Sequence, residues 1–173
     1  MSISRTLKSL AAVGLSCLFT SCAGYHLGAD KPTKLANVNT LAIPVFKNQS
    51  LEPRSSVLVT NNVIKQFQMD PTFKIVDTKN ADAVLKGTIL RFERRQLRGA
   101  KDNVLKSREL SIKLWVDYTV EDSKTAEVLA KGTAQGETSV FLDPKFQLTE
   151  RQAIDEASRK VAEEILSRVA EGW

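Results

Sequence analysis

Basic side chains gather in one short stretch of this 173-residue sequence, between positions 91 and 108. The basic cluster consists of Arg91, Arg94, Arg95, Arg98, Lys101, Lys106 and Arg108. Guanidinium groups form paired hydrogen bonds to phosphate oxygens. The same stretch also carries the apolar residues Phe92, Leu97, Val104 and Leu105. Basic and apolar side chains together predict a site for an anionic amphiphile, with a β-hairpin that uses charge only for solubility as the alternative.

Cys22 is a second candidate for chemistry, because it follows a short apolar run near the start of the chain. Two basic residues precede the run at 10–19, and the small residue Ser21 stands directly before the cysteine. Such a start is typical of a secretory signal, and the run is shorter than the roughly 20 apolar residues that span a membrane. The pattern resembles the bacterial lipobox, so we expect a signal peptide at 1–21 and lipid attachment at Cys22. The alternative is an ordinary signal with an incidental cysteine.

Cysteine usage favours the lipidated form. The chain has two cysteines, and Cys17 would leave with the signal, so Cys22 would have no disulfide partner in an oxidising compartment. In lipoprotein families an Asp after the cysteine retains the protein at the inner membrane. Here that residue is Ala23, which by resemblance implies the periplasmic side of the outer membrane. Residues 22–36 contain few large apolar side chains and are predicted to form a lipidated arm.

No set of catalytic residues is evident in the sequence. The single histidine, His26, lies in the predicted arm. No group of Cys and His has the spacing of metal ligands, and the common nucleotide-binding and nucleophile motifs do not occur. We therefore expect a protein that is not an enzyme and that holds neither a metal nor a cofactor.

Composition narrows the class of partner. Loss of Arg5 and Lys8 with the signal would lower the formal charge from +5 to +3, which suits an anionic partner such as lipid phosphate. Nucleic acid is not expected for an exported protein. The remaining length suits a single domain, predicted at 37–173.

Five segments are predicted to be strands. The clearest, 108–121, alternates apolar residues with polar ones, which indicates one buried and one wet face. The strand at 127–141 returns from it through a turn. Earlier strands are predicted at 37–46, where Pro44 marks an edge or an end, at 73–77, and at 83–97, where Gly87 marks a bend or bulge.

Two segments have helical periodicity. The first is predicted from an N-cap at Ser50 to Met69, with an apolar face of Val57, Val59, Val63, Ile64 and Phe67. The second is predicted from a capping box at Thr149 and Gln152 to Ala170, with an apolar stripe of Ile154, Ala157, Val161 and Ile165.

The resulting β-α-β-β-β-β-α order predicts an α+β fold. We expect a two-layer sandwich, with two helices on one face of a mostly antiparallel four-stranded sheet whose first or second strand is short. The other sheet face, with Lys113, Trp115 and Thr119, would be open and would offer a candidate binding surface.

Three stretches resemble the LptE-type lipopolysaccharide-assembly lipoproteins. Residues 22–27 are similar to that family's Cys-Gly-Tyr-His-Leu start, with Ala23 inserted. Residues 43–53 are similar to its Ile-Pro-x-Phe-x-Asn-x-Ser/Thr-x-Glu-Pro segment, and residues 81–89 to its Ala-Asp-Ala-x-Leu-x-Gly-x-Ile segment. The second half of the chain resembles the family only in its order of elements.

The resemblance implies a function. Members of this family plug a large outer-membrane β-barrel of the LptD type, assist its assembly, and help to pass lipopolysaccharide to the outer leaflet. The basic cluster is not transferred from the family and stays a hypothesis drawn from the residues alone. An outer-membrane activator of a peptidoglycan synthase is the alternative, although the short arm disfavours it because such proteins reach across the periplasm.

Overall fold

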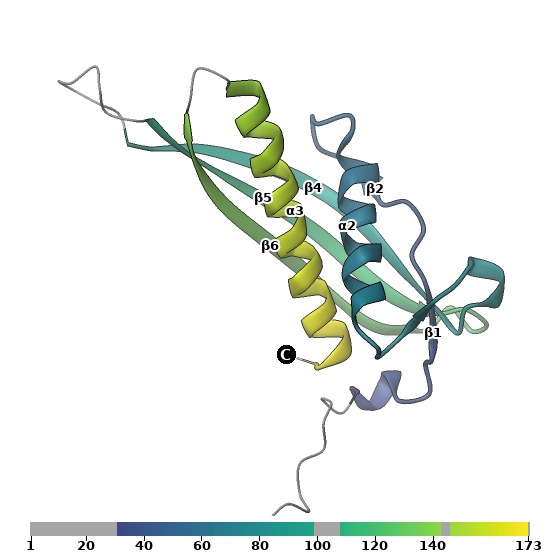
Figure 1. Cartoon of the computed structure of the whole chain (residues 1–173). Helices are drawn as coiled ribbons and strands as arrows, with labels where there is room; N and C mark the ends of the chain where they lie inside the picture. The colour runs from purple at the N-terminus through teal and green to yellow at the C-terminus, as the bar shows by residue number, and fades with distance from the viewer. Residues whose placement is uncertain (1–30, 99–107, 143–145, 173) are drawn as a thin grey trace, which may run out of the picture.

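Two long helices lie side by side on one face of a curved sheet in the computed structural model (Figure 1). The structure describes residues 31–98, 108–142 and 146–172. The helices are α2 (Ser55–Met69) and α3 (Phe146–Ala170). There are also two 3-10 turns: η2 (Thr33–Leu35) precedes the first strand, and η3 (Thr78–Asn80) lies between two strands. The predicted α+β class and the placement of both helices on one sheet face are confirmed.

The sheet is larger than predicted and mixed. It has six strands in the order β3-β1-β4-β5-β6, and β2 also pairs with β4. The strands are β1 (Thr40–Ala42), β2 (Lys47–Asn48), β3 (Lys74–Ile75), β4 (Ala83–Arg98), β5 (Arg108–Asp122) and β6 (Val128–Leu142).

Only the long strands β4, β5 and β6 pair antiparallel, whereas β1 pairs parallel with β3 and β4, and β2 pairs parallel with β4. The prediction of four mostly antiparallel strands was therefore wrong. The cause is the crossover from β1 through α2 to β3, which brings the chain back in the same direction and imposes parallel pairing.

Pro44 divides the first predicted strand. The expected segment 37–46 forms β1 up to Ala42, and pairing resumes only at β2, Lys47–Asn48. Proline has no amide hydrogen and cannot donate to a ladder, so the predicted end at Pro44 is confirmed. Residues 43–46 instead carry Phe46 into the core, where its amide donates to the Thr60 hydroxyl at 2.9 Å.

Both helix starts differ from the prediction. Ser50 is not the N-cap of α2, which begins five residues later at Ser55, because the Ser50 hydroxyl donates to Asn48 Oδ1 at 2.7 Å in a separate turn. Helix α3 begins at Phe146, so Thr149 lies inside it and is not the cap residue. The predicted helix ends at Met69 and Ala170 are confirmed.

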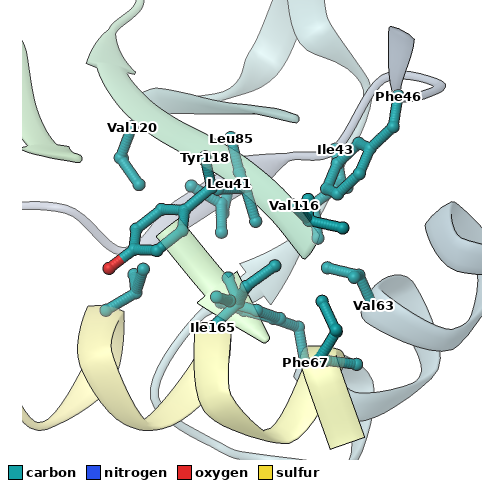
Figure 2. Packing of buried hydrophobic residues seen from close by; sticks show 14 of the residues in the cluster. Leu41, Ile43, Phe46, Val63, Phe67, Leu85, Val116, Tyr118, Val120 and Ile165 are labelled. Carbon is teal, nitrogen blue, oxygen red and sulfur yellow. The ribbon is translucent and has the colours of Figure 1, made fainter. Parts of the chain in front are cut away.

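The core lies between the two helices and the helix-facing side of the sheet (Figure 2). Strand β5 contributes every second residue, among them Leu114, Val116 and Val120, all with no exposed surface. This confirms the predicted alternation. Val57, which was expected on the buried face of α2, is 58% exposed. Helix α2 contacts α3 on one flank, and Val57 lies on an open side.

Two glycines allow close packing in this core. A Cβ at Gly87 would lie 2.2 Å from the buried Phe46 ring, so Gly87 is needed for packing, and the bulge expected there is instead at Leu90, between Ile89 and Arg91. A Cβ at Gly136 would lie 2.1 Å from the Ala157 carbonyl oxygen, so this glycine lets α3 rest directly on β6.

Helix α3 also covers the centre of the β6 edge. Strand β6 is last in the sheet, which leaves its outer main-chain groups without a strand partner. The Gln135 amide donates to the Glu164 carboxylate at 2.7 Å, and the Lys160 ammonium donates to the Glu137 carbonyl at 2.7 Å. Side chains from one helix thus satisfy groups that could otherwise pair with another chain.

Candidate binding surface

The arginines of β4 are divided between the two faces of the sheet. Phe92 and Arg94 stand opposite the buried Leu114 and Ile112 in the β4–β5 register, on the helix side. Arg91 and Arg95 stand opposite Trp115 and Ser111 on the other side. The bulge at Leu90 sets this arrangement, because one extra residue reverses the face of every side chain after it. The arginines of the predicted basic cluster therefore form two groups, one on each face of the sheet, and the two groups have different surroundings.

Arg94 forms an internal ion network at the helix starts. Its guanidinium is paired with Glu52, before α2, and with Glu150 in α3, where Nε lies 2.7 Å from the carboxylate. Burial opposes the positive charge, but the hydrogen bonds that Arg94 donates to Glu150 and Glu52 outweigh this effect and raise the pKa of Arg94. Arg94 thereby links β4 to both helices, and its side chain is only 35% exposed.

Arg91 and Lys113 lie over the indole ring of Trp115 on the open face. The guanidinium carbon of Arg91 is 4.7 Å from the ring centroid, and the Lys113 ammonium is 4.8 Å from it. Cation–π contacts of this length are favourable at partly exposed sites. Arg91 also donates to Glu93 at 2.8 Å, which lowers the pKa of that carboxyl. The three predicted open-face residues Lys113, Trp115 and Thr119 are all partly exposed.

The remaining predicted site residues lie toward one end of the long strands. Arg98 ends β4 and stands opposite Glu109, and Arg108 begins β5 opposite Leu142. Cys22 and Lys101 lie outside the described residues. Arg95 is exposed on the open face. The described part of the cluster thus offers Arg91 and Arg95 to solvent and uses Arg94 internally.

The outer edge of β4 is a feature that the sequence did not reveal. Pairing on this side runs through β1 and β2 and ends with the Gln49 amide, which donates to the Ile89 carbonyl at 2.9 Å. From Leu90 onward, β4 pairs only with β5 among the described residues. The signal in the sequence that could have indicated this edge is Pro44. It interrupts the pairing after β1, and only the short β2 follows.

Two of the three stretches that carried the family resemblance, 43–53 and 81–89, pack against each other. Phe46 of the first covers Gly87 of the second. Asp82 of the second accepts hydrogen bonds from the amides of Asn39 and Thr40, at 3.1 and 2.9 Å. Hydrogen bonds from the Thr40 side chain and the two amides lower the pKa of Asp82. These residues hold β1 and β4 together.

Within 31–98, 108–142 and 146–172, no three or more His, Cys, Asp and Glu residues form a group that could hold a metal. The same residues include no helix with the length and apolar character needed to cross a bilayer. The features that stand out are charged groups, an aromatic ring and a strand edge.

This fold and this surface define a small α+β domain with one helix-covered sheet face and one open, charged face. The chain belongs to the LptE family of lipopolysaccharide-assembly proteins, whose model matches residues 38–169. The resemblance drawn from residues 43–53 and 81–89 is thus confirmed. No curated protein matches the chain in sequence.

Solved structures share the fold at low sequence identity. A Helicobacter pylori protein, described as a homolog of neuraminyllactose-binding hemagglutinin, matches with a TM-score of 0.56 and 10% identity over 86% of this chain and 91% of its own. Protein CT253 of Chlamydia trachomatis gives 0.54 and 12%, over 78% and 96%. A minor lipoprotein of Acinetobacter baumannii gives 0.53 and 13%, over 78% and 92%. These matches concern the fold alone.

Proposed function

We propose that this protein is an outer-membrane lipoprotein that binds and plugs the β-barrel of a lipopolysaccharide translocon of the LptD type. It assists assembly of that barrel and insertion of lipopolysaccharide into the outer leaflet. The observation that carries the proposal is the family match over residues 38–169. The family acts without catalysis, and a rigid two-layer domain with an open face suits a binding role.

Cys22 is proposed to carry the lipid that holds the protein at the periplasmic side of the outer membrane. The basic start, the apolar run at 10–19 and the small Ser21 support it. Residues 22–30 precede the described domain and would span at most about 30 Å when fully extended. Such a tether would keep the domain beside the membrane in which the barrel lies.

The basic cluster is proposed to bind the phosphates of lipopolysaccharide. Arg91 and Arg95 are the described members that expose guanidinium groups on the open face, and Arg98, Lys101 and Arg108 continue the cluster along the chain. Arginine forks suit phosphate oxygens. Arg94 differs, because two carboxylates, those of Glu52 and Glu150, occupy its guanidinium on the helix side of the sheet, whereas Arg91 pairs only with Glu93 on the open face. We therefore assign glycolipid contact to the open-face arginines.

The binding test reverses charge on the open face. The paired change Arg91→Glu and Arg95→Glu should reduce retention of lipopolysaccharide in a pull-down by at least several-fold, since two phosphate contacts are lost. Arg159→Glu is the control, because Arg159 is equally exposed but lies on α3 between Glu156 and Glu163. Equal retention by both variants and the unchanged protein would refute glycolipid binding at this cluster.

Partner identity is tested by purification of the lipidated protein from outer membranes in mild detergent. A large β-barrel of the lipopolysaccharide translocon should co-purify in stoichiometric amount. Recovery of a penicillin-binding protein in its place would favour the peptidoglycan-synthase alternative and contradict the proposal.

A further inference from the structure

An unpaired strand edge lies beside the loop that leads into α2. On the outer side of β4, main-chain pairing stops at Ile89, as described above, and β4 continues to Arg98. Unpaired strand edges present amide and carbonyl groups in the spacing that another extended chain requires. Unlike the centre of the β6 edge, which Lys160 and Glu164 cover, this edge has no such cover among the described residues.

Next to this edge, an ordered loop holds a leucine in solvent. Leu51 is 99% exposed. Its neighbours are fixed, because Asn48 Nδ2 donates to the Glu52 carbonyl at 2.7 Å and the Ser50 amide donates to Asn48 Oδ1 at 2.9 Å. Glu52 is held further by its ion pair with Arg94. A single exposed leucine is ordinary, but one held on both sides by hydrogen bonds and an ion pair is presented in a defined position.

A small cavity joins the leucine to the strand edge. Its volume is about 170 Å³, and its lining includes Leu51, Leu90 and Phe92 together with the guanidinium-bearing Arg91. Gln49, Ser50, Glu52 and Arg94 complete the lining. The three apolar side chains suit one aliphatic side chain of a partner. The edge, the leucine and the cavity therefore fit an extended peptide with an aliphatic residue.

We propose that the outer edge of β4 from Leu90, together with Leu51, is the docking surface for an extended segment of the β-barrel partner. The segment adds to the sheet as a strand and places an aliphatic side chain against Leu51 and Leu90. This inference rests on the proposed function for the identity of the partner. It adds the surface, the mode of binding and the chemistry of the segment.

The test uses the full lipidated protein in outer membranes. Leu51→Asp places a charge at the centre of the docking surface and should reduce co-purification of the translocon barrel by at least tenfold. Val128→Asp is the matched control, because Val128 is also exposed, at 41%, but lies at the opposite edge of the sheet in β6. Thermal unfolding of both variants should match the unchanged protein, because neither side chain is in the core.

A photo-crosslinking amino acid at position 51 gives the second measurement. It should form an adduct with a peptide of the barrel, whereas the same group at position 128 should not. Undiminished co-purification of the Leu51→Asp variant, or an adduct with glycolipid in place of polypeptide, would overturn the docking surface and leave the proposed function intact. Absence of the barrel from purifications of the unchanged protein would instead overturn the proposed function, and the docking surface with it.

Discussion

Arg94 and Arg95 are neighbours in sequence, yet the structure gives them different roles. Arg94 turns toward the helices and joins Glu52 to Glu150, whereas Arg95 is exposed on the open face. Without Arg94, the two carboxylates would lie near each other without a cation between them. Arg94 therefore contributes to the stability of the fold, whereas Arg95 contributes positive charge to the open face.

Substitution separates the two arginines experimentally. Arg94→Ala should lower the free energy of unfolding by about 1 kcal/mol, an amount reduced by the partial exposure of the network. Arg95→Ala should change it by less than about 0.5 kcal/mol, as is usual for a surface side chain. Denaturant unfolding of both variants is the measurement, and equal losses would contradict the assignment of Arg94 to an internal network.

Asp82 predicts a dependence of stability on pH. Hydrogen bonds from Thr40 and Asn39 lower its pKa in the folded protein below the ordinary value of 3.8. A lowered carboxyl pKa stabilises the fold above the unfolded-state pKa, and this stabilisation is lost as the pH falls through the folded-state value. Asp82→Asn should therefore unfold at a lower temperature at pH 6, and the difference should shrink below about pH 4. A difference that stays constant down to pH 2 would exclude an ionised Asp82 as its source.

The sheet face on which each β4 arginine lies could not be inferred from the sequence. Leu85 and Ile89 are buried, so strict alternation would place Arg91 and Arg95 toward the helices. The bulge at Leu90 reverses this assignment. No residue type at that position signals an extra residue in one strand, because the bulge depends on the pairing with β5. The presence of a basic cluster was readable from the sequence, but its division between two faces was not.

At the scale of elements, the long strands were the easiest to predict. Strand β5 has one buried and one partly exposed face, and its period of two is complete from Ile112 to Val120. The short strands β1, β2 and β3 depend on parallel pairing between distant segments, which local periodicity does not show. The start of α2 was misplaced because Ser50 has the side chain of a cap residue but uses it in the turn at Asn48.

Gly136 is predicted to control the packing of α3 on β6. In Gly136→Ala, the new methyl group would meet the Ala157 carbonyl oxygen and the backbone of Val161, so the helix must move away from the strand. A cost of about 1–3 kcal/mol is expected in the free energy of unfolding.

Gly132→Ala is the matched control for this change, in the same strand. Its nearest neighbour is the Tyr118 hydroxyl oxygen, at 2.9 Å, and the end of that side chain can shift more easily than backbone. Its cost in thermal or denaturant unfolding should be smaller than that of Gly136→Ala. A larger loss in Gly132→Ala would show that the contact between α3 and β6 is not the limiting one.

At the scale of the whole molecule, the start of the described chain and the end of β4 are far apart. The described chain begins near η2, close to the C-terminal end of α3, while β4 runs toward the other end of the sheet (Figure 1). Strand β4 has 16 residues and so extends over about 50 Å. Arg95, near the far end of β4, thus lies far from the start of the described chain.

Removal of the lipid site tests this arrangement. Cys22→Ala should leave the circular dichroism spectrum and the unfolding temperature of the domain unchanged, because the core lies within residues 35–170. In cells depleted of the proposed barrel partner, which could otherwise retain the protein, the substitution should release the protein from the outer-membrane fraction, since the acyl chains would be lost. Fractionation of cell envelopes is the measurement, and full retention of the variant in the outer membrane would show that lipid is not required for its location.

The covered edge of β6 has a consequence for the number of partners. Chains that join edge to edge form open-ended filaments only if each copy offers two free edges of the sheet. Here Lys160 and Glu164 occupy the centre of the β6 edge, and the outermost strand on the other side, β3, has two residues. A strand of the proposed partner that adds along β4 would therefore complete the sheet. The protein would bind one such strand and would have a valency of one.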